Sequence, residues 1–156
     1  RETPSRAFHA FRELTHGYPH DPREVLKKTF ASEGDEMIVM RDIQFFSLCE
    51  HHLLPFFGKV HIGYLPKHVI AGASKLVRAV DVLSRRLQIQ ERLTSQIADT
   101  IQEALSPLGV IVVVEALHLC MAMRGIKQQT TFRTTACRGI FLRADVKDEF
   151  LAALKG

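Results

Sequence analysis

The segment GVIVVVEALHLCMAM, residues 109–123, is nearly unbroken apolar and contains four valines. β-Branched residues favour extended backbone, so this segment predicts a buried strand. Residues 130–142 follow it and are again rich in β-branched side chains. We therefore expect the two segments to be neighbouring strands near the end of the chain.

Two amphipathic helices are predicted before these strands. Apolar residues recur every three or four positions in each, which gives a helix one buried face. The second helix should stop near Pro107 and Gly109. The apolar positions are Leu76, Val77, Val80 and Leu83 in the first helix and Leu93, Ile97, Ala98, Ile101, Ala104 and Leu105 in the second.

Two more strands are predicted before the helices. β-Branched and aromatic content rises over residues 36–46, and residues 59–65 alternate with Val60, Ile62 and Tyr64 on one face. We expect residues 47–58 to join these two strands.

Helices are predicted at both ends of the chain. Thr3-Pro4 is a cap and first-turn pair, and Gly17 stops the apolar pattern that follows it. Asp21-Pro22 is a second cap and first-turn pair and predicts the start of another helix. The apolar positions are Ala7, Phe8, Ala10, Phe11 and Leu14 in the first helix, Val25, Leu26 and Phe30 in the second, and Val146, Phe150 and Leu154 in the closing helix.

The order of the elements predicts the fold class. Helices come first, then β-β-α-α-β-β, then a helix, which argues for an antiparallel sheet with helices on one face, an α+β fold. With 156 residues and 46% hydrophobic content, the chain fits one domain. We expect that domain over residues 1–156, with a helical part over 1–32 and the core over 33–156.

Composition narrows the class of partner. A net charge of +4 suits an anionic ligand, but the basic residues are dispersed, and no Trp and only two Tyr are available to stack on bases. These features argue against nucleic-acid binding. No apolar run of membrane-spanning length occurs, and residues 1–4 do not begin a secretory signal. We expect a soluble, cytoplasmic protein without a membrane partner.

Cys49-Glu50-His51-His52 places a thiol, a carboxylate and two imidazoles in four successive positions. We expect a loop beside a strand here. The Cys-x2-His spacing lets one turn of backbone present sulfur and nitrogen to the same Zn²⁺. Paired histidines in a loop can equally be surface residues, so this segment alone leaves metal binding open.

His118 and Cys120 form a second cluster. In a strand that continues through residues 115–120, alternation points both side chains to the same face. Without the first cluster, Cys120 could be a small buried hydrophobe and His118 a hydrogen-bonded core histidine. Three cysteines at wide spacing, Cys137 included, make a poor disulfide framework and favour metal binding or burial.

The two clusters together supply Cys49, His52 and Cys120 as three zinc ligands. Three protein ligands and a water are typical of catalytic zinc, whereas structural sites close with four. The water would ionise near neutral pH and act as a nucleophile. His51 and His118 remain available for proton transfer.

Several motifs in this order resemble the GTP cyclohydrolase I family, and the resemblance extends over residues 3–151. The family has the tunnelling fold (T-fold) and assembles as a toroidal homodecamer whose active sites are shared between subunits. The motifs are Cys49-Glu50-His51-His52, Gly63-Tyr64-Leu65-Pro66, Ser74-Lys75-Leu76-Val77-Arg78, Gln88-Ile89-Gln90-Glu91-Arg92-Leu93-Thr94, and His118-Leu119-Cys120 with Arg124-Gly125.

The resemblance implies zinc-dependent opening of the guanine imidazole ring of GTP, release of formate and closure to 7,8-dihydroneopterin triphosphate. This reaction is the first step towards tetrahydrofolate or tetrahydrobiopterin. By matching position, Cys49, His52 and Cys120 would hold Zn²⁺. His118 would protonate the purine N7, and His51 would assist the attack of water on C8.

The resemblance also implies the substrate contacts. Glu91 would accept hydrogen bonds from the guanine N1 and 2-amino groups, with Gln90 beside it. The ribose and triphosphate would be bound by Ser74, Lys75, Arg78 and Arg124. Lys75 and Arg78 lie three apart on a helix and could instead form a solvated face, while Glu91 could simply favour a helix N-terminus.

The sequence departs from the family pattern at two places. Ala73 replaces the usual Leu before Ser74, and residues 126–138 are one residue shorter than usual, so no contact is assigned there. Arg86 and Arg92 receive no role, and no regulatory protein is identified.

Two other functions use the same kinds of donor residue. A zinc-stabilised binding protein, with His51, His118 or Cys137 as fourth ligand, is a second hypothesis. A zinc nucleobase deaminase is rejected, because neither His-x-Glu nor Pro-Cys-x-x-Cys occurs.

Overall fold

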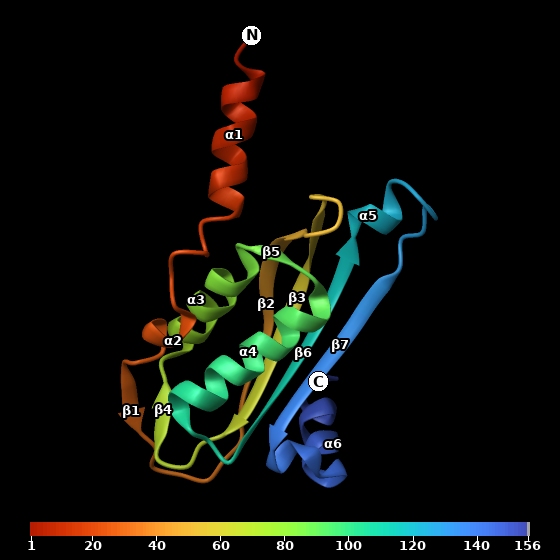
Figure 1. The fold of residues 1–156 in the computed structure, drawn as a ribbon. Coiled ribbons are helices and arrows are strands. Elements are labelled where there is room, and N and C mark those ends of the chain that lie inside the picture. Colours follow the sequence, from red (N-terminus) through yellow and green to blue (C-terminus); the bar gives the residue numbers. More distant parts are fainter. Residues whose placement is uncertain (156) are drawn as a thin grey trace.

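A five-stranded sheet forms the centre of the computed structural model, which describes residues 1–155 (Figure 1). Its order is β5-β2-β3-β6-β7, antiparallel except for the short parallel pair of β2 and β5. A separate pair joins β1 and β4. The strands are β1 (Thr29–Ala31), β2 (Ile38–Cys49), β3 (Pro55–Leu65), β4 (Val69–Ala71), β5 (Leu87–Gln88), β6 (Gly109–His118) and β7 (Thr131–Gly139).

The helices are distributed along the chain between and around these strands. Helices α3 and α4 fall between β3 and β6, as the sequence predicted. The helices are α1 (Thr3–Leu14), α2 (Pro22–Val25), α3 (Ala73–Ser84), α4 (Gln90–Leu105), α5 (Leu119–Ala122) and α6 (Ala144–Ala153), with a 3₁₀ turn η1 (Ile140–Leu142). None of the helices within residues 1–155 has both the length and the apolar character needed to cross a bilayer.

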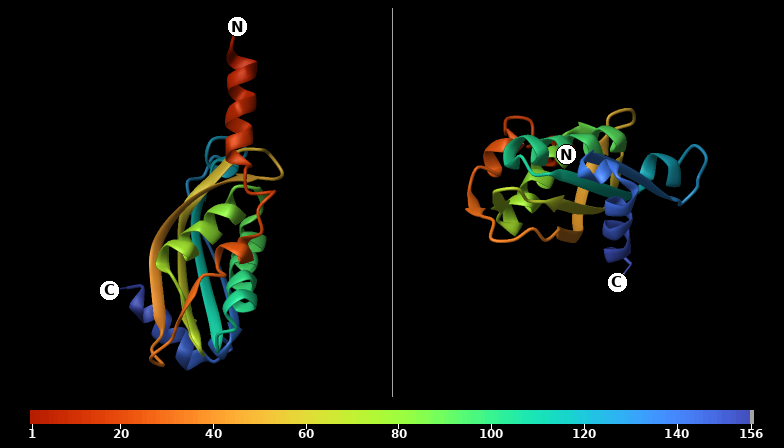
Figure 2. Two further views of the ribbon diagram at one scale, coloured as in Figure 1. Left: turned by 90° about the vertical axis from the view of Figure 1, so that its left-hand side faces the viewer. Right: turned by 90° about the horizontal axis from the view of Figure 1, so that it is seen from below.

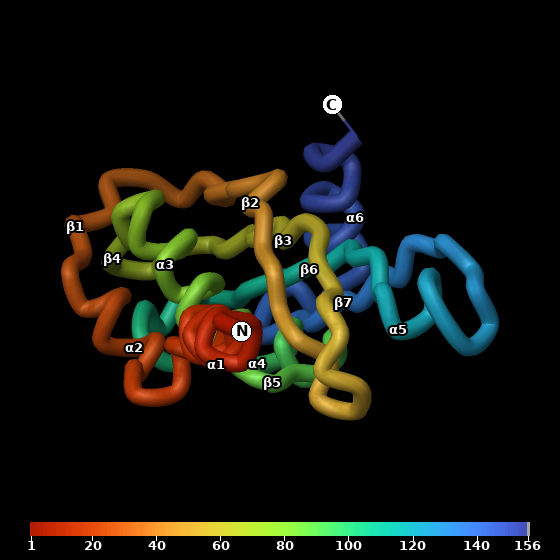
Figure 3. Tube along the Cα trace, turned by 90° about the horizontal axis from the view of Figure 1, so that it is seen from above, coloured from red at the N-terminus to blue at the C-terminus, as the bar shows by residue number. Residues whose placement is uncertain are grey.

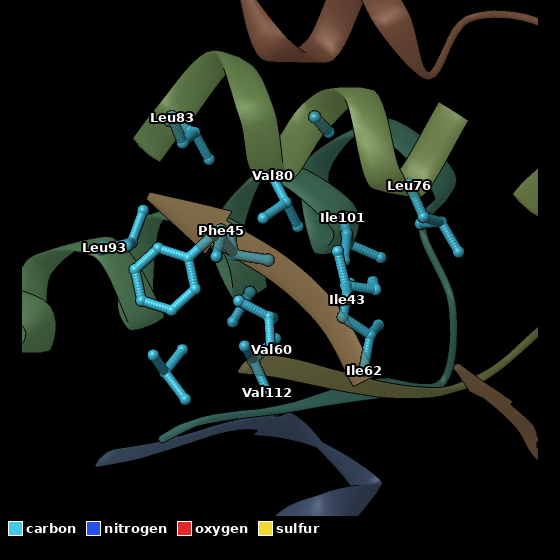
Figure 4. Close-up of a cluster of buried hydrophobic side chains, with 14 of the residues drawn as sticks. Ile43, Phe45, Val60, Ile62, Leu76, Val80, Leu83, Leu93, Ile101 and Val112 are labelled. Carbon is cyan, nitrogen blue, oxygen red and sulfur yellow. The ribbon is translucent and has the colours of Figure 1, made fainter. Parts of the chain in front are cut away.

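Helices α3 and α4 cover one face of the sheet and enclose the main core. Side chains of Leu76 and Val80 on α3 face Val60 and Ile62 on β3, and Ile101 on α4 lies among them (Figure 4). All five are at most 1% exposed. The predicted alternation of β3 is thus confirmed, and burial of this kind contributes about 1.5–3 kcal/mol per large aliphatic side chain.

Helix α6 lies on the opposite face of the sheet, so the expectation that helices cover one face only was wrong (Figure 2). Strand β6 is apolar on both sides: Val112 joins the main core, while Ile111 and Val113 pack with Phe141 and Phe150 beneath α6. A strand buried on both faces has no reason to alternate with polar residues, which explains its unbroken apolar sequence.

Helix α1 projects away from the rest of the chain and buries no residue (Figure 1). Its apolar Phe8 is 58% exposed. The predicted start is displaced by one residue: Thr3 is already helical and Glu2 is the cap, with no side-chain capping bond. The Asp21 cap of α2 is confirmed, because its side chain accepts from Arg23 N. Phe30, expected in that helix, lies in β1 instead.

The β2–β3 hairpin is longer than the sequence suggested. Pairing continues to Leu48 opposite Pro55, so the connection shortens from residues 47–58 to 50–54. Gly58 lies within β3, and a glycine is needed there because a Cβ would meet Glu115 O at 1.9 Å. This glycine therefore permits close backbone approach between strands rather than ending one.

Strand β6 ends earlier than predicted. It stops at His118, and Leu119–Ala122 forms the helical turn α5. Strand alternation therefore does not explain how Cys120 and His118 come together. The β2–β3 turn, β5 and α5 lie at the same end of the molecule (Figure 1), and Figure 3 looks down on that end, with α1 seen end-on. The candidate site is at this end.

Candidate active site

A cavity of about 280 Å³ lies where the ends of β2 and β6 meet the beginning of α4. It is lined by both clusters that the sequence singled out and by aromatic side chains beneath them. The lining residues are Cys49, His51, His52, Phe56, Gln88, Ile89, Gln90, Glu91, His118, Cys120, Met121 and Phe132.

The turn after β2 presents the first cluster to this cavity. Cys49 is the last residue of the strand, and its N–H donates to Leu54 O at 2.9 Å. The N–H of Leu53 returns to Cys49 O at 2.8 Å, while Glu50 N donates to Gln88 O at 3.0 Å. The turn is therefore fixed by main-chain bonds to the end of β2 and to β5.

Cys49, His52 and Cys120 form the group that could hold a metal. Their donor atoms all lie within 4.8 Å of one another, and Cys49 Sγ is 3.7 Å from His52 Nδ1. A tetrahedral zinc site with Zn–S of about 2.3 Å and Zn–N of about 2.0 Å requires S···N separations of about 3.5 Å. The distance between these two atoms fits that requirement.

The two thiols also fit a cation electrostatically. Burial raises the pKa of Cys120, and the nearby Cys49 thiol raises it further. Both effects disfavour a thiolate in the absence of a counter-charge. A divalent cation among these three groups would offset both, and two sulfurs with one imidazole are donors that zinc prefers.

His118 is held in a partly apolar position beside the metal group. Its ring stacks on Phe56 with centroids 4.7 Å apart and planes 5° apart, and Phe132 meets it edge-on at 5.8 Å. Burial lowers the pKa of His118, while the charge of Glu91 opposes that effect. Glu91 itself is exposed at the edge of the same cavity.

Gln90 is placed differently from the substrate contact that the sequence suggested. Its side chain belongs to a residue only 1% exposed, and its amide nitrogen donates to Val114 O at 3.0 Å and Phe132 O at 2.9 Å. Its carbonyl oxygen lies 2.7 Å from His118 Nε2. The amide is thus bound by protein groups on both sides.

His51 stands at the opening of the cavity. Its side chain is 65% exposed, and its Nε2 lies 3.9 Å from the Glu50 carboxylate. His51 and His118 do not belong to the group of clustered metal donors found within residues 1–155. Cys137 packs between the sheet and α6, away from that group. The candidates for a fourth protein ligand are therefore not clustered with the other three.

The residues expected to bind ribose and phosphate are not all at this cavity. Ser74, Lys75 and Arg78 lie in the first half of α3, and none of them lines it. The 12 residues of α3 span about 18 Å, and the end of the helix nearest the cavity is Ser84. Arg124 is closer, since its charge lowers the pKa of Cys120.

Arg92 has a structural connection that the sequence did not reveal. Its guanidinium bonds the Glu50 carboxylate, and it also donates to Gln88 Oε1 at 3.1 Å and Leu87 O at 3.3 Å. This pairing lowers the pKa of Glu50. Sequence spacing could not predict the contact between Glu50 and Arg92, because the two residues are distant in sequence and lie on different elements.

The sequence model of one protein family, described as GTP cyclohydrolase I, matches residues 1–155. The chain belongs to the GTP cyclohydrolase I family. Curated relatives named GTP cyclohydrolase 1 agree with this assignment. The protein of Parabacteroides distasonis is 51% identical over 99% of this chain and 80% of its own length. That of Bacteroides thetaiotaomicron is 52% identical over 96% and 78%.

The relative from Wolinella succinogenes is 51% identical, over 99% of this chain and 84% of its own length. A solved structure, the archaeosine synthase QueF-Like in the apo form, superposes with a TM-score of 0.56 at 17% identity, covering 69% of this chain and 97% of that one. At this identity the likeness concerns the fold alone. The predictions of the family and of the tunnelling fold are both confirmed.

Proposed function

We propose that this chain is a GTP cyclohydrolase I that hydrolytically opens the guanine imidazole ring of GTP, releases formate and forms 7,8-dihydroneopterin triphosphate. The observation that carries the proposal is a group of three metal donors lining the same cavity as His118 and Glu91, in a chain of this family. Residues 1–156 would act as a single domain, in the cytoplasm, at the first step towards tetrahydrofolate or tetrahydrobiopterin.

Glu91 selects the base. Its carboxylate, exposed at the edge of the cavity, would accept from the guanine N1–H and 2-amino groups. Adenine lacks both donors in that arrangement, and a carboxylate left unpaired beside a bound base is costly. Discrimination between GTP and ATP therefore rests on this side chain.

Cys49, His52 and Cys120 would hold Zn²⁺, which when bound supplies a Lewis acid that activates water for the hydrolytic steps. His118 contributes a proton to the purine N7, which makes C8 electrophilic. Its position on the ring of Phe56 keeps one side of the imidazole free of water. His51, at the cavity opening, would accept a proton from the attacking water.

The triphosphate is bound by cations from more than one subunit. Ser74, Lys75 and Arg78 do not line the cavity of their own chain, which supports a homo-oligomer, a decamer in this family, with shared sites. Arg124 would contribute from the same chain as the metal ligands. Lys75, Arg78 and Arg124 would supply three positive charges to the four negative charges of the triphosphate.

Mixing two inactive variants tests the shared site. Lys75→Ala and Cys120→Ser subunits, dissociated and reassembled together, should recover part of the wild-type activity, because some sites then combine an intact Lys75 with an intact Cys120. Each variant reassembled alone is the control. Mixed oligomers that stay inactive would argue that each chain completes its own site.

Incubation of the purified protein with GTP and with ATP tests the function itself. We expect a pterin chromophore and formate from GTP only. Removal of metal with a chelator should leave a folded but inactive protein, whereas a purely structural zinc would unfold the chain when lost. Absence of both products from GTP in the zinc-loaded protein would end the proposal.

A further inference from the structure

The orientation of the Gln90 amide is fixed by its neighbours. Its nitrogen lies 3.0 Å from Val114 O and 2.9 Å from Phe132 O, and main-chain carbonyls can only accept hydrogen bonds. The group facing these two oxygens must therefore be the NH₂. The carbonyl oxygen of the same amide then faces His118, with no freedom to exchange places.

This orientation determines which ring nitrogen of His118 carries a hydrogen. Nε2 lies 2.7 Å from Gln90 Oε1, and an amide oxygen can only accept. Nε2 is therefore the donor, and in the neutral imidazole the lone pair is on Nδ1. Within residues 1–155, Nδ1 makes no hydrogen bond. It is not one of the buried atoms without a partner, so it is accessible from the cavity that His118 lines.

Aromatic contacts fix the plane of the same ring. Phe56 lies parallel to the imidazole, 5° between planes, and Phe132 closes the edge at 76°. Phe132 also supplies a carbonyl that holds the Gln90 amide. The ring can therefore neither tilt nor turn over without losing the hydrogen bond to Gln90.

We propose that Gln90 is a positioning residue: it keeps one hydrogen on His118 Nε2 and fixes the ring, so that Nδ1 is the nitrogen that carries the proton to the purine N7 and is left with a lone pair after the transfer. The assignment rests on the proposed function. Gln90 has no side-chain polar atom left for a substrate, because its Nε2 is bound by Val114, Phe132 and Thr134 and its Oε1 by His118.

Replacement of Gln90 by methionine tests the assignment. Met has a similar length and no hydrogen-bonding amide, so the ring loses its fixed partner while the space stays filled. We expect kcat for GTP to fall about 10- to 100-fold, the usual effect of misplacing a reacting group by about 1 Å. We expect KM to stay within about twofold. A raised KM with an unchanged kcat would mean a substrate contact and would overturn the proposal.

Gln102→Met is the matched control. Gln102 lies on the same helix and donates one hydrogen bond to a main-chain carbonyl, Pro107 O at 3.1 Å, but does not line the cavity. Its kcat should be that of the wild type. An equal loss in both variants would show that helix α4 is merely weakened, and would overturn the positioning role.

A double variant tests whether Gln90 acts through His118. In a His118→Ala background, Gln90→Met should lower kcat no further. Independent, multiplying losses would contradict the proposal.

Nitrogen NMR reads the tautomer without any turnover. In substrate-free wild-type protein labelled with ¹⁵N-histidine, at a pH where the ring is neutral, the His118 signals, identified by their absence from His118→Ala, should show a protonated Nε2 and an unprotonated Nδ1. The opposite pattern would overturn the proposal even if Gln90→Met cannot be folded. A wild-type protein inactive on GTP would refute the proposed function, while this spectrum would still decide the tautomer.

Discussion

Arg92 connects the turn that carries two of the three metal ligands to the sheet and to α4. Its guanidinium bonds Glu50 in the turn, Gln88 Oε1 at 3.1 Å and Leu87 O at 3.3 Å. Two of these partners belong to β5, so the side chain is already fixed where it meets Glu50. Arg92→Ala removes this connection, and we expect weaker retention of zinc.

The magnitude follows from what remains in the variant. Glu50 N still donates to Gln88 O at 3.0 Å, and Cys49 N to Leu54 O at 2.9 Å. The turn is therefore loosened rather than released. Residues that support metal ligands typically change metal affinity by about 10- to 100-fold, and with two main-chain bonds intact we expect a loss of about tenfold.

Competition with a chromophoric chelator measures the zinc affinity directly, without turnover. Arg85→Ala is the control, because Arg85 also pairs with a carboxylate, Asp81 at 3.3 Å, but that carboxylate lies on α3 and not in the turn beside the metal donors. Its zinc affinity should match the wild type. The reasoning fails if Arg92→Ala binds zinc as tightly as the wild type, or if both variants lose affinity equally.

Three further outcomes are expected. Cys120→Ser should lose zinc and cyclohydrolase activity together, while Cys137→Ser keeps both; metal analysis after gel filtration checks this, and a zinc-replete Cys120→Ser would refute the ligand assignment. Phe56→Ala should cost about 3–5 kcal/mol of unfolding free energy in denaturant titrations, well above the cost of Phe57→Ala at a half-buried position, and similar costs would be contrary evidence. Burial lowers the pKa of His118, so the unfolded chain takes up this proton first as pH falls; stability of the metal-free protein should drop below about pH 6.5. His118→Phe should flatten part of that drop, and identical pH profiles would count against it.

The main elements of the fold could be predicted from hydrophobic periodicity because that pattern reflects burial directly. Val60 and Ile62 alternate towards the core, and the apolar positions of α4 follow its buried face. The three short strands β1, β4 and β5 could not be predicted. Each contains two or three residues, too few for any period, and pairs with strands distant in sequence.

The candidate site was found from its donor atoms, but partly for the wrong structural reason. Cys120 reaches the cavity through the helical turn α5, since the apolar sequence after His118 suits a strand or a helix equally well. The role of Gln90 could not be predicted, because its partners Val114 and Phe132 are distant in sequence. Only the folded sheet places them beside the Gln90 amide.

The clustering of Cys49 with Cys120 has a consequence for the unfolding of the chain. An ion bound there would tie together two segments separated by a long stretch of polypeptide, including all of α3 and α4. Such a cross-link lowers the entropy gained on denaturation, as a covalent bridge closing the same loop would. Loading with the ion should therefore slow amide hydrogen exchange in β3, well beyond the ligands themselves.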